Sequence, residues 1–354
     1  MANSLDELVN MPRLTAWLDA NLPQLGDGPL QVEMVHGGFS NVIISLDRGN
    51  GVMMLRRPPV TPPPGSERTA LREARVLSAL DRTAVPHPRC FASCDDPDVI
   101  GAVFYVMERV EGWSGKIVDR RAEHPAPFNQ PPFAWRLPYA VMDALVALGN
   151  VDYEAVGLGD FGKTDRFLER QVDRWSSQLA SYKDKYGYAG RELPGYAETE
   201  RWLRDNTPVN WKPGIIHGDL GTPNMLFSHE HPVRVNALID WELSTVGDPM
   251  IDIGWFLGGL RDEREPDVVP NSMMDAANMP TRQELARYYA SGTGRDVSML
   301  DYYLVLARFK GGCIMEYKVA QAAAGKLSRE IGDFFADIVA DSFASAADIV
   351  RKYG

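Results

Sequence analysis

The stretch that decides the fold of this 354-residue chain runs Ile215-Ile216-His217-Gly218-Asp219-Leu220-Gly221-Thr222-Pro223-Asn224-Met225-Leu226-Phe227. Apolar segments typical of strands flank a polar loop that carries Asp219 and Asn224. A second acidic site follows in Leu238-Ile239-Asp240-Trp241-Glu242. A hairpin over Met225–Phe227 and Val233–Ile239 would bring these three oxygen-bearing side chains into one cleft.

These residue types match the needs of phosphoryl transfer. One carboxylate orients the attacking hydroxyl and accepts its proton, while an amide oxygen and a second carboxylate hold Mg²⁺ against nucleotide phosphates. Each residue alone is more often structural, with Asp219 capping a turn, Asn224 starting a strand and Asp240 ending one. Their combination at this spacing favours a phosphotransferase site.

Three motifs together carry a resemblance. His217-Gly218-Asp219-x4-Asn224, then Ile239-Asp240-Trp241-Glu242, then Gly247-Asp248-Pro249-x2-Asp252 resemble the aminoglycoside phosphotransferase family of small-molecule kinases. The resemblance covers nearly the whole chain and implies an α+β, protein-kinase-like bilobal fold. The stretches 160–163 and 169–175 are similar to the branch found near, or fused to, acyl-CoA dehydrogenases.

The resemblance also implies roles for individual residues. Asp219 is expected to be the catalytic base, and Asn224 and Asp240 the Mg²⁺ ligands. His217 would support the geometry of the catalytic loop, although a satisfied core histidine is the alternative. Glu242 either lies near the metal or caps the strand.

The segment after these motifs is expected to position them. Asp248 at an N-cap, followed by proline as the first helical residue, predicts a helix over Met250–Leu260. Asp252 falls within the apolar run of this helix, where a carboxylate is costly unless its oxygens are paired. The resemblance implies that Asp252 accepts hydrogen bonds from the backbone of the catalytic loop.

The nucleotide end of the site is expected in the strand-rich segment. Backbone amides of the loop Gly37-Gly38-Phe39-Ser40-Asn41 could approach phosphates, but Gly-Gly turns are also common in hairpins. Backbone groups from Glu108 to Val110 lie where a hinge would bind the purine.

A cation for the α- and β-phosphates is expected at the end of the strand beginning at Val52. Protein kinases use lysine there, but the first lysine of this chain is Lys116 and all ten basic residues before it are arginines. Arg56 is therefore the candidate, with Glu73 as its partner. Arg57 is the alternative, and either arginine could instead be a surface charge.

The chain is predicted to divide into a nucleotide-binding lobe, residues 1–111, and a helical lobe, residues 112–354, with a catalytic loop and an acceptor site. Strands around the Gly37-Gly38 turn and the Arg48–Gly51 turn form the first lobe. Ser66 is expected to cap a helix that runs to Leu80. Residues 112–137 are read as a long loop, with a role as substrate lid left open. The remaining helices are predicted near 139–149, 164–186, 282–290, 299–321 and 328–351.

The composition of the chain disfavours two classes of partner, nucleic acids and membranes. The chain has 37 Lys+Arg against 48 Asp+Glu, a net charge of −11, and no basic block, which disfavours nucleic-acid binding. No apolar run approaches the length of a membrane span, and the N-terminus lacks the pattern of a signal peptide. We therefore expect a cytoplasmic protein that does not bind membranes, with its oligomeric state open.

The function predicted is that of an ATP- and Mg²⁺-dependent kinase, with GTP as an alternative donor, that phosphorylates a hydroxyl group of a small molecule. The acceptor is either a hydroxylated acyl-CoA-type metabolite or an aminoglycoside-like sugar. The alternative is a nucleotide-binding module without catalysis. A protein kinase is disfavoured because Asp240-Trp241-Glu242 stands in place of Asp-Phe-Gly and no activation segment is recognisable.

Overall fold

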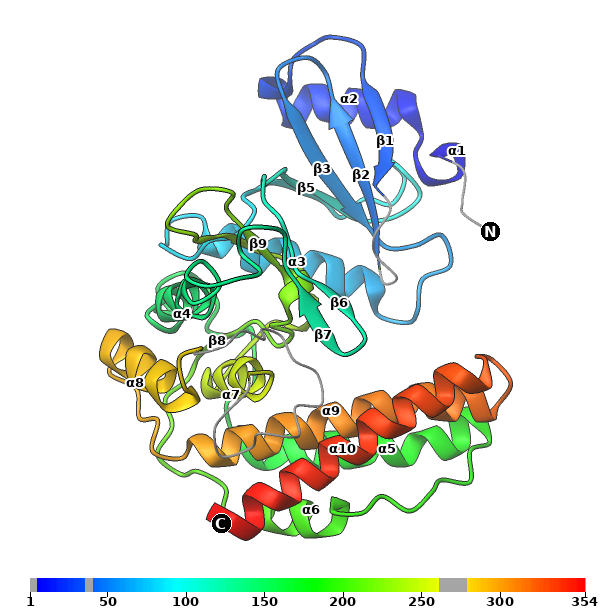
Figure 1. The fold of residues 1–354 in the computed structure, drawn as a ribbon. Helices are drawn as coiled ribbons and strands as arrows, with labels where there is room; N and C mark the ends of the chain where they lie inside the picture. Colours follow the sequence, from blue (N-terminus) through cyan, green and yellow to red (C-terminus); the bar gives the residue numbers. More distant parts are fainter. Residues whose placement is uncertain (1–4, 36–40, 261–278, 354) are drawn as a thin grey trace.

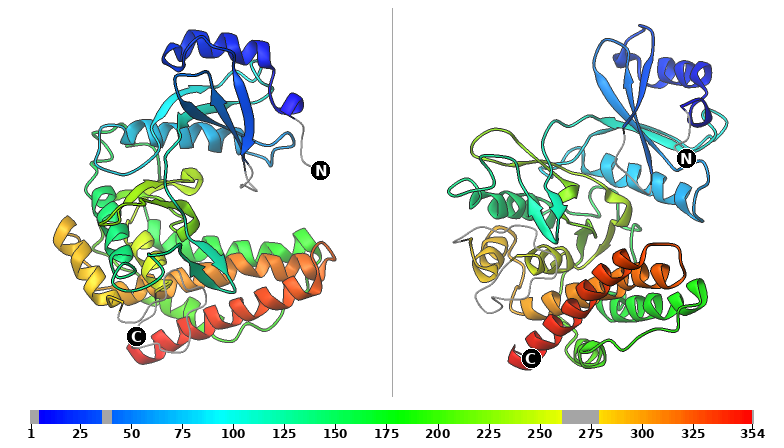
Figure 2. Two further views of the ribbon diagram at one scale, coloured as in Figure 1. Left: turned by 45° about the horizontal axis from the view of Figure 1, so that its top comes forward. Right: turned by 45° about the vertical axis from the view of Figure 1, so that its right-hand side comes forward.

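The structure, a computed structural model, describes residues 5–35, 41–260 and 279–353. Figure 1 shows a strand-rich part at the top and a helical part below it, which is the arrangement predicted for a bilobal α+β fold. Figure 2 shows the same separation from two other directions: α5 (Phe167–Tyr186), α9 (Leu300–Ala323) and α10 (Arg329–Tyr353) lie together, far from the sheet. The division of the chain between residues 111 and 112 stays a prediction.

Five antiparallel strands form the sheet in the order β1-β2-β3-β5-β4. The turn between β2 and β3 contains Gly49 and Gly51, whose φ angles of +95° and +137° are readily adopted only by glycine. This confirms the hairpin predicted at that turn. The strands are β1 Gln31–Val35, β2 Val42–Asp47, β3 Val52–Arg57, β4 Cys90–Cys94 and β5 Phe104–Glu108.

The two faces of the sheet have different partners. Leu55 of β3 is fully buried in a cluster with Leu14 and Leu18 of α2 (Met11–Asn21), a helix that the sequence analysis did not predict. Successive side chains of a strand point to opposite faces. Arg56 therefore faces the other side, where it meets Glu73 of α3 (Ser66–Leu80).

Two helices are capped by residues other than those predicted. Ser66 does not cap α3: the capping position belongs to Gly65, in a left-handed conformation, and the Ser66 hydroxyl donates to the Pro63 carbonyl. Ser66 is already helical, so its side chain cannot take the capping geometry. The helix α7 (Met250–Gly258) starts at the predicted residue and ends two residues before the predicted Leu260. Its capping position belongs to Pro249 and not to Asp248, although Asp248 accepts the Met250 N–H at 3.0 Å.

The helical part is organised around α9, which is buried along most of its length and packs against α5, α7 and α10. The five predicted helical ranges agree with α4, α5, α8, α9 and α10 to within three residues at each end. The helix α6 was not predicted. The bounds not yet given are α1 Leu5–Leu8, α4 Arg136–Gly149, α6 Tyr196–Asp205 and α8 Arg282–Thr293, with a short 3-10 helix at Pro23–Leu25.

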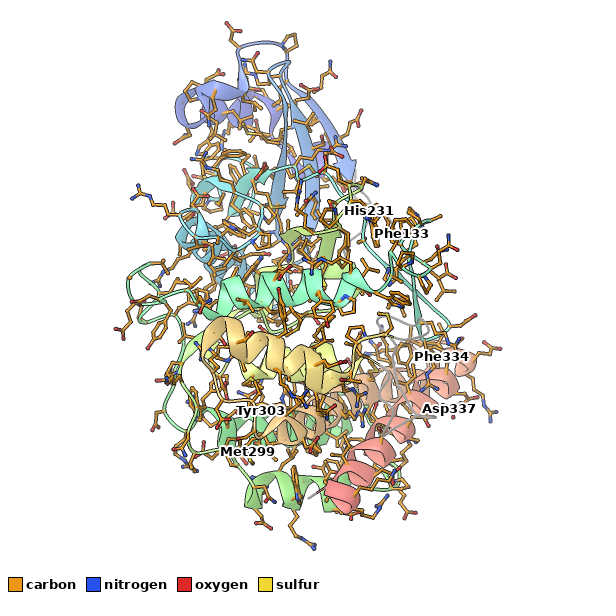
Figure 3. The ribbon with its side chains drawn as sticks, turned by 60° about the vertical axis from the view of Figure 1, so that its left-hand side comes forward. Phe133, His231, Met299, Tyr303, Phe334 and Asp337 are labelled. Carbon is orange, nitrogen blue, oxygen red and sulfur yellow. The ribbon has the colours of Figure 1, made fainter. Side chains whose placement is uncertain are left out.

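The segment 112–137 is not the featureless loop that we predicted. It contains a small hairpin of β6 (Lys116–Val118) and β7 (Arg121–Glu123), and Trp113 exchanges backbone hydrogen bonds with Phe227. Phe133 lies against His231 with ring centroids 4.3 Å apart (Figure 3). Aromatic packing thus docks this segment onto a neighbouring hairpin. A role as lid stays a prediction.

Two short strand pairs bring the motif residues together. The strands β8 (Gly214–Ile216) and β11 (Thr245–Gly247) pair antiparallel, as do β9 (Met225–Phe227) and β10 (Val235–Leu238). The catalytic loop, residues 217–224, and the turn 239–244 therefore lie side by side, each ending in or containing a 3-10 turn, Thr222–Asn224 and Trp241–Leu243. Among the described residues, none of the helices combines the length and apolar character that a membrane crossing requires.

Candidate active site

The carboxylate of Asp252, in α7, binds the backbone of the catalytic loop. The two oxygens of Asp252 accept the backbone N–H groups of His217 at 2.7 Å and Gly218 at 2.9 Å. Burial raises the pKa of Asp252 to about 6, and the two hydrogen bonds oppose that rise. The contact implied by the resemblance is therefore present in the structure.

His217 connects the loop to the following hairpin. Its ring is fully buried, Nε2 bonds the Ile239 carbonyl at 3.0 Å, and Nδ1 accepts the Asp219 N–H at 3.3 Å. Burial lowers the pKa of His217 to about 4, so the ring is neutral at pH 7. This geometry suits a residue that shapes the loop better than one that transfers a proton.

Asp219 and Asn224 face each other across the loop. The Asn224 amide nitrogen donates to the Asp219 carbonyl at 2.9 Å and to its Oδ2 at 3.1 Å. Both donors of the amide are thereby used, so its oxygen is the end left for a cation. Burial raises the pKa of the half-buried Asp219 carboxyl, while Lys310 opposes the rise.

Asp240 lies where β10 ends and has a left-handed backbone, φ +66°. Its Oδ1 accepts Nη2 of Arg56 at 2.7 Å, and Glu242 Oε2 lies 3.5 Å from the same nitrogen. The second oxygen of Asp240 has no partner among the described residues. This oxygen and the amide oxygen of Asn224 are hard donors of the kind Mg²⁺ takes, alongside phosphate oxygens and water. No cluster of three or more His, Cys, Asp or Glu side chains suited to a metal occurs in the described part of the chain.

Arg56 forms the predicted pair with Glu73. Arg56 Nε lies 3.0 Å from Glu73 Oε2, and both side chains are buried. The other Glu73 oxygen accepts the Trp241 N–H at 2.9 Å, which connects α3 to the turn after β10. Burial raises the pKa of Glu73 to about 7, against the lowering influence of Arg56.

Arg57 has a different environment. Its guanidinium donates to the carbonyls of Leu8, Ile100 and Pro58 and is buried on the α2 side of the sheet. Of the two arginines considered from the sequence, only Arg56 lines the cleft between the two parts.

That cleft has a volume of about 420 Å³ and is the candidate nucleotide site. Asn224, Asp240 and Arg56 line it with polar groups. Apolar lining suited to a purine comes from Ile43, Met107 and Leu226. A pocket of this volume lies within the usual range for small-molecule sites.

The predicted hinge and phosphate loop are only partly described. Glu108 donates its N–H to the Arg89 carbonyl, whereas the Val110 N–H has no partner among the described residues and remains available to a base. Gly37, Gly38, Phe39 and Ser40 lie outside the described residues. Asn41 lines the cleft, and its amide donates to Glu242 at 3.2 Å.

Sequence reasoning missed Lys310. This lysine of α9 is buried and donates to the Gly218 carbonyl at 2.8 Å, next to Asp219. Burial lowers its pKa to about 8. The signal was a lysine inside the run Phe309 to Cys313, which otherwise lacks charge.

Comparisons with known proteins add to this geometry. The family model described as "Phosphotransferase enzyme family" matches residues 31–295. The chain is 31% identical over 323 residues to "Probable acyl-CoA dehydrogenase IBR3" of Arabidopsis thaliana, which covers 83% of this chain and 37% of that protein. The chain thus spans roughly two fifths of the length of the curated relatives it matches, between 37% and 41%.

Solved structures share the fold. A Ralstonia eutropha protein assigned to the aminoglycoside phosphotransferases superposes with a TM-score of 0.78 at 27% identity, covering 96% of this chain and 98% of that one. A spectinomycin phosphotransferase in complex with ADP and spectinomycin has a TM-score of 0.56 at 12% identity, covering 95% and 98%. At the lower identity the likeness shows the fold alone.

Proposed function

Because this chain belongs to the phosphotransferase enzyme family, and is thus a small-molecule kinase, we propose that it transfers the γ-phosphoryl group of ATP to a substrate hydroxyl, with Asp219 as base. GTP is the alternative donor. One observation carries the proposal: Asn224 and Asp240 line the same cleft as Arg56, and Asn224 also bonds Asp219. The candidate base therefore lies at the edge of the candidate nucleotide site.

Different side chains of this chain would bind the nucleotide, hold the metal ion and activate the acceptor. Arg56, held by Glu73, would bind the α- and β-phosphates, and Asn224 and Asp240 would hold Mg²⁺. The bound ion would neutralise phosphate charge. Asp219 would orient the acceptor hydroxyl and take its proton as the hydroxyl oxygen bonds the γ-phosphorus. The bond from that phosphorus to the bridging oxygen then breaks and ADP leaves.

The acceptor that we propose is a hydroxylated acyl thioester or a related metabolite. Its support is the set of relatives named as acyl-CoA dehydrogenases, of which this chain spans only part. An aminoglycoside-like sugar is the alternative acceptor, because spectinomycin is the ligand of a structural neighbour.

Nucleotide binding can be tested by thermal unfolding. A ligand that binds only the folded state raises its stability, by about 2.7 kcal/mol at a hundredfold excess over Kd. We expect ATP with Mg²⁺ to raise the unfolding temperature more than ATP with EDTA does. Asp240→Asn should shrink the difference between the two conditions. Equal shifts in both conditions, or no shift at millimolar ATP, would contradict the assignment.

A catalytically inactive nucleotide-binding module is the second candidate. The observation that favours it is the 2.7 Å contact of Arg56 with Asp240, which places a cation on an expected metal ligand. This alternative predicts stabilisation by ATP but no ADP release with any acceptor hydroxyl.

A further inference from the structure

A second cavity lies against the catalytic loop. Ile216 and Gly218 line it, whereas Pro223 and Asn224 line the nucleotide cleft, and Asp219 lies between these two pairs in the chain. Leu243 and Thr245 add to its wall, and the remaining lining comes from α5, α7 and α9, so we call it the α9 pocket. Its volume of about 50 Å³ is far below the roughly 300–1,000 Å³ of a pocket that encloses a whole ligand. The pocket can therefore hold one end of a molecule.

Lys310 supplies unused hydrogen-bond donors to the α9 pocket. Its side chain is buried, and Nζ makes a single hydrogen bond, to the Gly218 carbonyl, among the described residues. An ammonium has three N–H donors, so two of them have no partner there. The ammonium also lies over the ring of Trp255, 4.2 Å from its centroid, and 5.5 Å from that of Trp175.

Two further donors line the same pocket. Arg174 of α5 stacks on Trp175 at 4.6 Å, and it has no hydrogen bond or ion pair with any residue that the structure describes. The buried indole nitrogen of Trp255 likewise has no partner within the described ranges. Lys310, Arg174 and Trp255 thus each leave an unused donor in this wall.

The charged side chains around the α9 pocket also favour an anionic ligand. The pocket lining contains two cations and no carboxylate, in a chain whose net charge is −11. Asp219 and Asp252 attract Lys310 through space, while Arg174 repels it, and burial lowers the pKa of Lys310 to about 8. An ammonium without an ionic partner is costly to bury, and a bound anion would offset that cost.

We propose that the α9 pocket binds an oxyanion, a carboxylate or a phosphate, carried by the hydroxyl acceptor. Lys310 and Arg174 then select anionic acceptors over cationic ones, and the indole rings pack against the adjoining alkyl part. The statement that the anion belongs to the acceptor rests on the proposed function, whereas the binding of an anion does not depend on it. A polycationic aminosugar is the acceptor that this wall disfavours.

Binding is tested on the full chain with three small probes: butyrate, ethyl phosphate and butylammonium. The fluorescence of Trp175 and Trp255 reports occupancy, and the two anions distinguish a carboxylate from a phosphate. We expect an anion to bind and butylammonium not to bind. Arg174→Met and Lys310→Met should each weaken anion binding about tenfold, because each removes a charge-assisted bond. Lys183→Met, at an exposed site on the same helix α5, should have no effect.

A second test measures turnover with acceptors of different charge. Lactate, lactamide and isopropanolamine share a small hydroxylated skeleton and carry a negative, no and a positive charge. We expect kcat/KM for ADP release to fall in that order, and Arg174→Met to raise KM for lactate alone.

Several outcomes would overturn the proposal. These are equal binding of butyrate and butylammonium, no binding of either anion, or isopropanolamine as the best acceptor. If none of the three is phosphorylated, the binding titration alone decides. If an anion binds while ATP fails to stabilise the chain, the anion site in the α9 pocket is supported and the proposed kinase function is contradicted.

Discussion

Around Asp219, burial sets the protonation of each neighbouring side chain. It lowers the pKa of His217 to about 4 and that of Lys310 to about 8, and it raises the pKa of Asp252 to about 6. At pH 7 the ring is therefore neutral and the lysine is mostly charged. The raised pKa of Asp219 has the same cause and makes this carboxylate a better proton acceptor.

The chemistry of Asp219 gives the first prediction at this scale. Asp219→Asn keeps the size of the side chain and removes the proton acceptor. Turnover should fall by roughly 10²–10⁴-fold, the usual contribution of a general base. ADP release with an acceptor measures this. Stabilisation by ATP serves as the control, because the residues expected to hold the nucleotide remain. An unchanged rate of ADP release would show that the carboxylate is structural.

His217 gives a prediction about pH. Its pKa falls from the ordinary 6.5 to about 4 in the folded chain. Between these values the unfolded chain binds a proton that the folded chain excludes, so the free energy of unfolding falls as pH drops from 6.5 to 4. At about 1.4 kcal/mol per pKa unit, the loss is about 3 kcal/mol.

His217→Gln should remove this loss in urea unfolding measured across the same pH range. The raised pKa of Asp252 acts in the opposite sense between its ordinary value and about 6, and it is present in both proteins. The difference between the proteins therefore isolates His217. Identical pH profiles would assign the acid sensitivity to other groups.

At the scale of elements, the catalytic loop depends on how closely α7 approaches α9. Gly254 permits that approach, because a Cβ there would lie 2.5 Å from the Tyr303 carbonyl oxygen. The same helix carries Asp252, which holds the backbone of the loop. Helix packing and loop position are therefore linked.

Gly254→Ala should destabilise the chain by about 1–3 kcal/mol, the usual cost of overpacking. Gly258→Ala is the matched control in the same helix, since the nearest atom would be 3.8 Å away. That variant should change the free energy of unfolding by less than about 1 kcal/mol. Urea unfolding compares the two. Equal effects would mean that α7 can shift without cost.

At the scale of the whole molecule, Arg56 ties the strand-rich part to the helical part. It extends from β3 and contacts Glu73 of α3 and Asp240 after β10 through different nitrogens. A planar guanidinium can do this, whereas a lysine presents one nitrogen.

Arg56→Lys should therefore lower the free energy of unfolding by about 1–3 kcal/mol, because one buried partner is left unpaired. The rise in unfolding temperature caused by ATP should also shrink. Arg57→Lys is the comparison: it also loses buried bonds, but its contacts lie away from the cleft. If both variants respond to ATP as the unmodified chain does, Arg56 does not contact the nucleotide.

Much of the fold could be predicted because its signals are local. The apolar periodicity of α3 and the glycines of the turn between β2 and β3 act over a few residues, and both were read from the sequence. The short strand β4 and the aromatic docking of Trp113 depend on distant partners, and they were missed or misread. The roles of the site residues stay predictions, although Arg56 and Glu73 meet as expected.

The sequence by itself determined the family, the two kinds of secondary structure and the spacing of Asp219 and Asn224, since these properties belong to contiguous segments. Only the tertiary structure decided which distant groups meet. Arg56 reaches Asp240 across 184 positions, and Lys310 reaches Gly218 across 92. No periodicity specifies such contacts, because they arise when separate elements bury their apolar faces against each other. The packing of α5, α7 and α9 therefore decides the charge of the wall beside Asp219.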